Sequence, residues 1–231
     1  MRVEIYDDSY GAVEYINHMG TDLTVVNAAR VSFAVQKSEL DEKDKKLLRY
    51  LLQHNHTSPF EHCSITMRFT VPLFIRSQHH RHRTWSYNEV SRRYTGEEIK
   101  FYEPKAFRTQ HKSNRQASNS ETINPTLSGL SIGYDKASDC LKASHTQSLT
   151  LYRSMLSSGI CREQARGVLP QNLYTQYYGT VNLHNLYKFI QLRLHEGAQW
   201  EIQQVARACL SVVEEHFPIC TQFYKETKGM T

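Results

Sequence analysis

The sequence predicts an α+β fold: a single domain over residues 1–231, in which a largely antiparallel sheet packs against helices, one of them long. Three observations support this class. A chain of 231 residues favours one domain, whose core is large enough to be stable without disulfides or structural metal ions. Short segments with strand patterns alternate with longer segments of helical spacing, and the chain contains no internal repeat.

The N-terminal part predicts a strand followed by two helices. Residues Arg2–Tyr6 alternate apolar with other residues, as a strand does. Asp22 and Asp41 are good N-caps, and each precedes apolar residues at helical spacing. These apolar residues are Leu23, Val26, Ala29 and Phe33 for the first helix, and Leu47, Leu48, Leu51 and Leu52 for the second.

A second strand and a third helix come next. Apolar residues alternate over residues 65–71 and predict a strand that Pro72 ends. A helix from about Leu73 would then present the segment 81–94 at its C-terminal end.

The middle of the chain predicts a loop and then two helices. Residues 109–128 are rich in Ser, Asn, Thr and Gln, which indicates a flexible loop or insertion. A long helix is expected from about Leu130 to Ser157, closed by Gly159. A short helix over Glu163–Val168 would be stopped by Pro170.

The C-terminal part predicts one more strand and two helices. Residues Leu173–Val181 are aromatic and β-branched, which favours a strand. Residues Leu183–Leu194 and Trp200–His216 have helical spacing. This order of elements favours antiparallel strands with helices packed beside them.

The positive charge of the chain is concentrated in one region. The net charge is +5. Residues 76–115 contain ten Lys/Arg and four Asp/Glu. By contrast, residues 1–75 contain eight Lys/Arg and ten Asp/Glu, and residues 116–231 contain ten Lys/Arg and nine Asp/Glu. Such a local surplus suits an anionic ligand and is too confined for a protein that coats nucleic acid.

The cysteines indicate a reduced, cytoplasmic protein. Their number is odd, and no pair has metal-ligand spacing. The sequence shows neither an apolar leader segment nor a run of about eighteen apolar residues, so it does not predict export or membrane insertion. The thiols expected to be mostly buried are Cys63, Cys140, Cys161, Cys209 and Cys220.

The segment Arg81–Tyr94 has the side chains needed to bind a phosphorylated, planar heterocycle. It reads Arg-His-Arg-Thr-Trp-Ser-Tyr-Asn-Glu-Val-Ser-Arg-Arg-Tyr. Arginine forks bind phosphate, aromatic rings and guanidinium planes stack on flat rings, and Asn, Ser and Glu bond to polar ring edges. Composition alone also allows a solvated arginine-rich face or a nucleic-acid patch.

The order of these residues resembles the signature of the flavin-dependent thymidylate synthases. That signature is Arg-His-Arg, two residues, Ser, one residue, Asn-Glu, one residue, Ser, one residue, Arg-Tyr. The resemblance extends over nearly the whole chain, and residues 109–128 are least covered. Every fixed position is matched, by Arg81, His82, Arg83, Ser86, Asn88, Glu89, Ser91, Arg93 and Tyr94.

A cluster of histidines at residues 54–62 first suggests a metal site. Pro59 breaks any helix there, so the zinc pattern of two histidines four residues apart on a helix is not formed. We therefore expect a capped turn with partly exposed histidines, and no metal. The stretch also resembles the family's His-x-Ser/Thr-Pro-Phe-Glu-His motif, which implies that His56 and Ser58 contact flavin.

Two arginines outside the signature have competing interpretations. Arg166 follows Glu163-Gln-Ala and by itself would be a surface charge, but the resemblance implies that it binds the nucleotide. Arg193 lies among apolar residues and needs an anionic or strongly accepting partner. A structural salt bridge is one interpretation. The resemblance implies instead that Arg193 touches the uracil ring and helps to ionise its imide.

The resemblance also implies a reaction and its participants. The protein would convert dUMP to dTMP, with methylenetetrahydrofolate as carbon donor, NADPH-reduced FAD as reductant and no cysteine nucleophile. Its sites would lie between subunits of a homotetramer, and its partners would be these small molecules rather than nucleic acid or a membrane. Among the departures, His79 and His80 replace a more usual aromatic pair, and Lys188 replaces an Asn.

By this resemblance, Arg193 is the expected catalytic residue, and the other site residues follow position by position. The expected dUMP site comprises Gln78, His79, His80, Arg81, Glu89, Val90, Ser91, Arg92, Arg93, Arg166 and Arg193. The expected FAD site comprises His56, Ser58, Arg81, His82, Arg83, Glu89, Asn182, His184 and Lys188.

Two other functions compete with this one. A nucleic-acid-binding module would use the basic, aromatic segment and bind oligonucleotides in a salt-dependent way. A flavin reductase without methyl transfer would share the flavin site and oxidise NADPH without needing dUMP.

Overall fold

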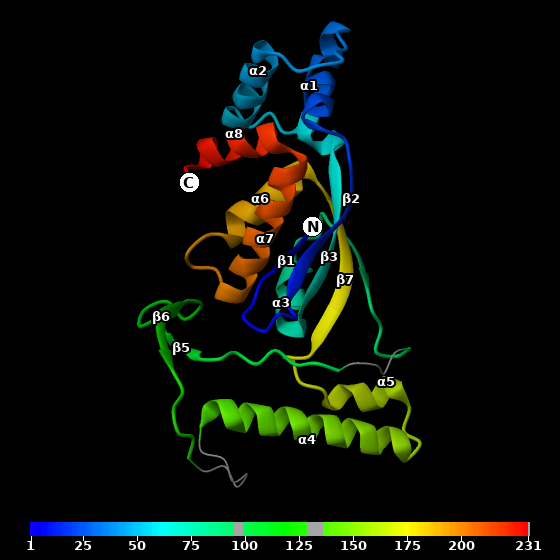
Figure 1. The fold of residues 1–231 in the computed structure, drawn as a ribbon, viewed down its shortest axis with the longest axis vertical. Helices are drawn as coiled ribbons and strands as arrows, with labels where there is room; N and C mark the ends of the chain where they lie inside the picture. Colours follow the sequence, from blue (N-terminus) through cyan, green and yellow to red (C-terminus); the bar gives the residue numbers. More distant parts are fainter. Residues whose placement is uncertain (95–98, 129–135, 231) are drawn as a thin grey trace.

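A central sheet has helices against one side and further helices at either end (Figure 1). The computed structural model describes residues 1–94, 99–128 and 136–230. The strands are β1 (Arg2–Glu4), β2 (Ala12–Met19), β3 (Ser64–Pro72), β4 (Ser86–Glu89), β5 (Phe107–Gln110), β6 (Ser118–Ile123) and β7 (Tyr174–Asn182). The α-helices are α1 (Asp22–Arg30), α2 (Glu42–Gln53), α3 (Leu73–His79), α4 (Ala137–Ser157), α5 (Arg162–Ala165), α6 (Leu183–Arg193), α7 (Trp200–His216) and α8 (Pro218–Lys228). The 3₁₀ turns are η1 (Val31–Phe33), η2 (Ser58–His62) and η3 (Arg166–Val168).

The main sheet has the strand order β1-β2-β3-β7-β4, and each neighbouring pair is antiparallel. The alternating apolar residues of β3 are buried and belong to the main core, together with residues of α6 and α7. The intervening residues are polar: Arg68 pairs with Glu14 at 2.7 Å, and Thr66 bonds to Thr180 at 2.9 Å. The predicted α+β class is therefore confirmed.

One of the two predicted helix caps is wrong. Asp41 caps α2, since its carboxylate accepts from the Asp44 N–H at 2.9 Å. The N-cap of α1, however, is Thr21 rather than Asp22. The Asp22 carboxylate instead accepts from the N–H groups of Ile219 and Cys220, at 3.1 and 2.9 Å, and so caps the distant helix α8.

Strands β2 and β4 and helix α8 were not predicted. The alternation of β2 is interrupted by an irregularity between Tyr15 and Asn17, which moves the following side chains out of the period of two. Strand β4 carries the polar centre of the signature at the edge of the sheet, so its residues are mostly exposed and show no apolar pattern. Phe33, expected on the first helix, is 79% exposed in η1.

The polar segment 109–128 is partly regular. Strands β5 and β6 pair as an antiparallel hairpin, which was not predicted, and the expectation of a flexible loop or insertion stays a prediction. Backbone pairing can form such a hairpin without an apolar pattern. Helix α4 begins at Ala137, and the expected start near Leu130 lies outside the described residues.

Helices α4 and α5 lie beyond one end of the sheet (Figure 1) and form a second, smaller core. Tyr152 of α4 packs there with Ala165, Leu169 and Leu173. The short helix expected over 163–168 is confirmed as α5 followed by η3. This small core holds η3 beside the first residues of β7, which matters for the site described next.

The prediction that the thiols are mostly buried is confirmed. The five cysteines form no disulfide, and only Cys161 is exposed. In the described ranges, no helix combines the length and apolarity required to cross a membrane. Within the same residues, no three His, Cys, Asp or Glu side chains gather as metal ligands would.

Candidate active site

The first part of the signature forms a tight turn after α3. The N–H of His82 donates to the carbonyl of His79 at 2.9 Å, and the N–H of Trp85 donates to the carbonyl of His82 at 3.3 Å. The Tyr87 hydroxyl donates to both carbonyls, at 2.9 and 3.2 Å. This turn leaves Arg81 and Arg83 exposed while the following residues enter β4.

The aromatic residues of the signature mostly support the fold. Trp85 is 5% exposed and packs edge-on against Phe69, with ring centroids 5.9 Å apart. Tyr87 is partly buried and stacks on His80 at 4.0 Å. Only Tyr94 of the three is open to a ligand, being 78% exposed. The expectation that these rings stack on a heterocycle is therefore wrong for Trp85, which the core surrounds.

His79, expected in the nucleotide site, lies behind the surface of the chain. It is fully buried, and its Nδ1 is 2.8 Å from the Tyr177 hydroxyl. Burial, together with the nearby cationic groups, holds the pKa of His79 well below its usual range, so the ring stays neutral. His80 is partly exposed beside it, on the turn.

A cleft of about 480 Å³ lies between β4, η3 and the start of β7. This volume is within the range of about 300–1,000 Å³ that is usual for small-molecule sites. The residues predicted to bind dUMP that line it are Glu89, Val90, Ser91, Arg92 and Arg166. The other lining residues are Leu73, Arg76, Gly167, Leu169, Gln171, Leu173, Tyr174 and Thr175. Two motifs that are far apart in the sequence thus meet at one cleft.

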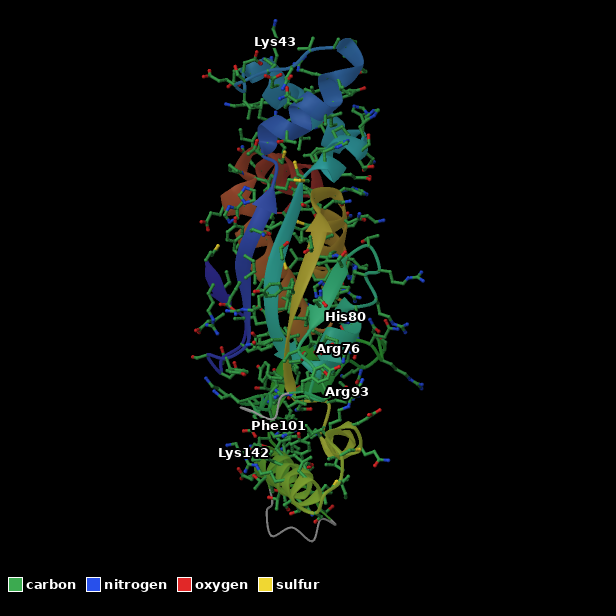
Figure 2. All side chains as sticks on the ribbon, turned by 90° about the vertical axis from the view of Figure 1, so that its right-hand side faces the viewer. Lys43, Arg76, His80, Arg93, Phe101 and Lys142 are labelled. Atoms are coloured by element: carbon green, nitrogen blue, oxygen red, sulfur yellow. The ribbon has the colours of Figure 1, made fainter. Side chains whose placement is uncertain are left out.

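Glu89 is held in place by two residues that were not predicted to belong to the site. Its Oε1 accepts from Arg76 Nε at 3.2 Å and from the Thr175 hydroxyl at 2.7 Å. Figure 2 shows Arg76, His80 and Arg93 along the same edge of the sheet. Arg76 precedes the signature by about one and a half turns of helix, and this spacing from a binding motif is the signal that could have indicated it.

The remaining arginines of the signature differ in their surroundings. Arg92 Nη2 donates to the carbonyl of Tyr174 at 3.4 Å, which ties it to the cleft wall. Arg93 is about half exposed, and its guanidinium is 3.7 Å from the Glu163 carboxylate. The Ser91 hydroxyl accepts from the Arg93 N–H at 3.2 Å, so it orders the backbone of the motif.

Arg193 and His82 form a second group, which lies outside the lining of the cleft. Arg193 Nε donates to His82 Nε2 at 3.0 Å. Burial and the Arg193 charge lower the pKa of His82 to about 4, so near pH 7 the neutral ring accepts this bond. Among the described residues, Arg193 pairs with no carboxylate, which speaks against a structural salt bridge.

We expect His82 to make stability depend on pH. Its folded pKa of about 4 lies below the ordinary value of 6.5, so the unfolded state binds more protons between these values. The titration of His82 therefore costs no free energy of unfolding above about pH 6.5. As the pH falls from 6.5 towards 4, the free energy of unfolding decreases, because the unfolded state takes up the proton first. His82→Gln keeps an acceptor but cannot titrate, so its thermal midpoint should fall less across this window. Equal slopes for the variant and the parent protein would show this expectation to be wrong.

The residues expected to hold FAD do not lie together. Two of them have been placed above: Glu89 lines the cleft, and His82 contacts Arg193. His56, His184 and Lys188 line a cavity of about 90 Å³ where η2 and α2 meet α6. Arg81 and Arg83 are exposed on the turn after α3. Asn182, also expected, caps α6 by accepting from the Asn185 N–H at 2.9 Å, and Ser58 lies at the first position of η2. A cavity of 90 Å³ can receive only part of a dinucleotide.

Comparisons with known proteins agree on one family. The family model described as thymidylate synthase complementing protein matches residues 14–219. A flavin-dependent thymidylate synthase of Thermus thermophilus is 40% identical over 94% of this chain and 76% of the relative, and that of Thermotoga neapolitana is 38% identical over 94% and 91%. The solved structure of the UMP/dUMP methylase PolB from Streptomyces cacaoi, bound with 5-Br dUMP, has a TM-score of 0.76 and 30% identity, and the match covers 97% of both chains.

Proposed function

Because this chain belongs to the family of flavin-dependent thymidylate synthases, we propose that it is a cytoplasmic enzyme that converts dUMP to dTMP by reductive methylation. Methylenetetrahydrofolate is the carbon donor, and NADPH reduces the bound FAD. The observation that carries the proposal is the cleft of about 480 Å³, which brings Glu89 to Arg92 of the signature together with Arg166 of a separate motif.

In this proposal the cleft binds the phosphate end of the nucleotide, and the uracil ring extends out of the cleft towards Arg193, which lies outside its lining. Arg166 is exposed at η3 and lines the cleft with Arg92, so the two guanidinium groups provide the positive charge that a phosphate requires. Glu89 offers its acceptor oxygens to hydroxyl or N–H groups of the nucleotide, and Arg76 and Thr175 hold its orientation. Ser91 is a ligand contact rather than a nucleophile.

Arg193 is the proposed catalytic residue. Its Nε is engaged by His82, and this bond directs the terminal N–H groups of the guanidinium. A fixed positive group of this kind stabilises the negative charge of an ionised uracil imide, and this ionisation raises the electron density at the carbon that is methylated. His82 remains neutral because its pKa is lowered, so it does not compete with Arg193 as a second cation.

The chemistry of the residues fits FAD, although one cavity does not enclose it. Arg81, Arg83 and Lys188 are cations suited to the diphosphate, and His56 and His184 can pack against or bond to the rings. FAD, when bound, supplies the reducing equivalents for the transferred carbon. Because these residues occupy two surfaces of one chain, we propose that a second subunit completes each site, within a homotetramer.

No thiol is expected to take part in the reaction. Burial, with the charge of Asp22, raises the pKa of Cys63 to about 11, and burial also raises the pKa of Cys209 and Cys220. These groups are neutral near pH 7 and are poor nucleophiles. A variant with all five cysteines replaced by Ala or Ser should keep its dTMP turnover per bound flavin, with a stability loss of about 1 kcal/mol per buried site.

The cysteine-free variant is judged only when it is folded and loaded with flavin. Cys161→Ser is the matched single variant, because Cys161 is exposed and stands at the N-cap position of α5, shortly before Arg166. Loss of turnover in a folded, flavin-loaded variant, traced to one cysteine, would point instead to a thiol mechanism.

The absorbance spectrum of the purified protein tests the proposed function against its rivals. Flavin bands that NADPH bleaches without oxygen, faster when dUMP is present, support it. Bleaching that occurs at the same rate with and without dUMP favours a flavin reductase. A protein that binds no flavin under any condition, but binds oligonucleotides with strong salt dependence, would be a nucleic-acid-binding module.

A further inference from the structure

Arg76 and Glu89 are carried by two elements whose positions in the cleft wall are fixed. Arg76 lies on α3, and the first residue of this helix is tied to the segment before β7, since the N–H of Leu73 donates to the carbonyl of Leu173 at 2.9 Å. Glu89 is the last residue of β4, which pairs with β7 itself. Both side chains line the cleft of about 480 Å³. Regular elements of this kind hold side chains more precisely than loops do.

The ion pair leaves donors and an acceptor unused. Arg76 Nε donates to Oε1 of Glu89 at 3.2 Å, and the Thr175 hydroxyl donates to the same oxygen at 2.7 Å. Within residues 1–94, 99–128 and 136–230, the terminal N–H groups of Arg76 and Oε2 of Glu89 have no further bonding partner. The two side chains keep 32% and 24% of their surface exposed, so a ligand in the cleft can reach both.

A hydroxyl is the ligand group that matches this pair, because one hydroxyl can donate and accept at the same time. Its O–H would donate to Oε2 of Glu89 while its oxygen accepts from an N–H of Arg76. A phosphate matches the pair less well, since its oxygens only accept and the Glu89 carboxylate repels them. The cations proposed for the phosphate, Arg92 and Arg166, line the same cleft.

We propose that Arg76, paired with Glu89, is a further substrate-binding residue and that the pair recognises the 3′-hydroxyl of the nucleotide. The inference rests on the proposed function, in which the cleft holds the phosphate end of dUMP. The sugar follows the phosphate, and the 3′-hydroxyl is the only hydroxyl that the deoxyribose of dUMP carries. A nucleotide without this hydroxyl would leave the carboxylate and the guanidinium without a partner from the ligand, which lowers the affinity.

The test compares dUMP with 2′,3′-dideoxyuridine 5′-monophosphate, whose affinities for the FAD-loaded enzyme are measured by calorimetry. In the parent enzyme, loss of the hydroxyl should weaken binding by about 10- to 150-fold, the range for a hydrogen bond to a charged group. Arg76→Met keeps an unbranched side chain but removes the donors, so this ratio of affinities should fall by about fivefold or more. Arg162→Met is the matched control, because it removes an equal charge outside the cleft, and its ratio should equal that of the parent enzyme.

Deoxyuridine, which lacks the phosphate, separates this role from a phosphate contact. If Arg76 binds the phosphate, Arg76→Met weakens the binding of dUMP more than that of deoxyuridine and leaves the preference for dUMP over the dideoxy nucleotide unchanged. A parent-like preference in the folded Arg76→Met protein therefore overturns the proposal. A parent enzyme that binds dUMP and the dideoxy nucleotide equally well overturns it too.

A second variant keeps the proposal testable if Arg76→Met does not fold. Thr175→Val removes the hydroxyl that holds Glu89 but keeps Arg76 and the shape of the side chain, so it should lower the same preference, and a parent-like value contradicts the proposal. A parent enzyme that binds neither dUMP nor deoxyuridine contradicts the proposed function itself. A parent enzyme that binds dUMP without regard to the 3′-hydroxyl contradicts only this inference.

Discussion

Replacing Arg193 by alanine is expected to keep FAD binding but to lower dTMP formation, by roughly 2 to 4 kcal/mol if it acts like an oxyanion donor. The effect is large because Arg193 is the only residue to which we assign stabilisation of the ionised imide. Its guanidinium is oriented by His82 at 3.0 Å and, among the described residues, is not neutralised by a carboxylate. Turnover should be measured per flavin-loaded site, together with thermal stability.

The competing role for Arg193 is structural, and the same variant separates the two. A buried ion pair would cost about 3 to 5 kcal/mol of stability when one partner is removed. Arg193→Lys is a useful companion, because lysine keeps the charge but lacks the planar fork and should also lose turnover. An alanine variant that is destabilised, yet turns over normally per folded flavin site, would show the catalytic role to be wrong.

The second large effect is expected from Arg166→Ala, which should weaken dUMP binding by about 10- to 150-fold, the range for loss of a charged hydrogen bond. Arg166 is exposed on η3 and lines the cleft, so it is available to the phosphate. The turnover rate at saturating dUMP should change much less, because the phosphate is distant from the reacting carbon.

The matched control for Arg166 is Arg162→Ala. Arg162 is also an exposed arginine and lies one turn earlier, in α5, but it does not line the cleft. Its loss changes the net charge equally and should leave dUMP affinity nearly unchanged apart from weak, screened effects. If both variants lose affinity by the same factor, Arg166 contributes only through the long-range electrostatic attraction of its positive charge, and not through a contact in the cleft.

The elements that were predicted correctly are those in which one local pattern decides the structure. The alternating residues of β3 are all buried, and the helices α2, α6 and α7 are confirmed where apolar residues have helical spacing. The elements and caps that were not predicted depend on contacts between distant parts of the chain. Asp22 caps α8 across the fold rather than its own helix, and β4 exists because β7 offers its backbone as a partner. No local pattern contains that information.

The candidate site was predicted only in part, since five of the residues expected to bind dUMP line the cleft and the others do not. The motifs named Glu89 and Arg166, and the structure places both at one cleft. Burial of His79 and Trp85 in the core could not be predicted, because histidine and tryptophan serve equally as ligand contacts and as packing. Arg76 was missed because it belongs to the helix before the signature and reaches Glu89 only after β4 has paired.

The most direct test of the central claim is the conversion of the nucleotide itself. The flavin-loaded protein is incubated without oxygen with dUMP, NADPH and methylenetetrahydrofolate, and the nucleotides are separated and identified by mass spectrometry. The proposed function predicts dTMP, formed only when folate and flavin are both present. Reduced flavin together with unchanged dUMP, in protein that binds the nucleotide, would contradict it and leave a flavin reductase.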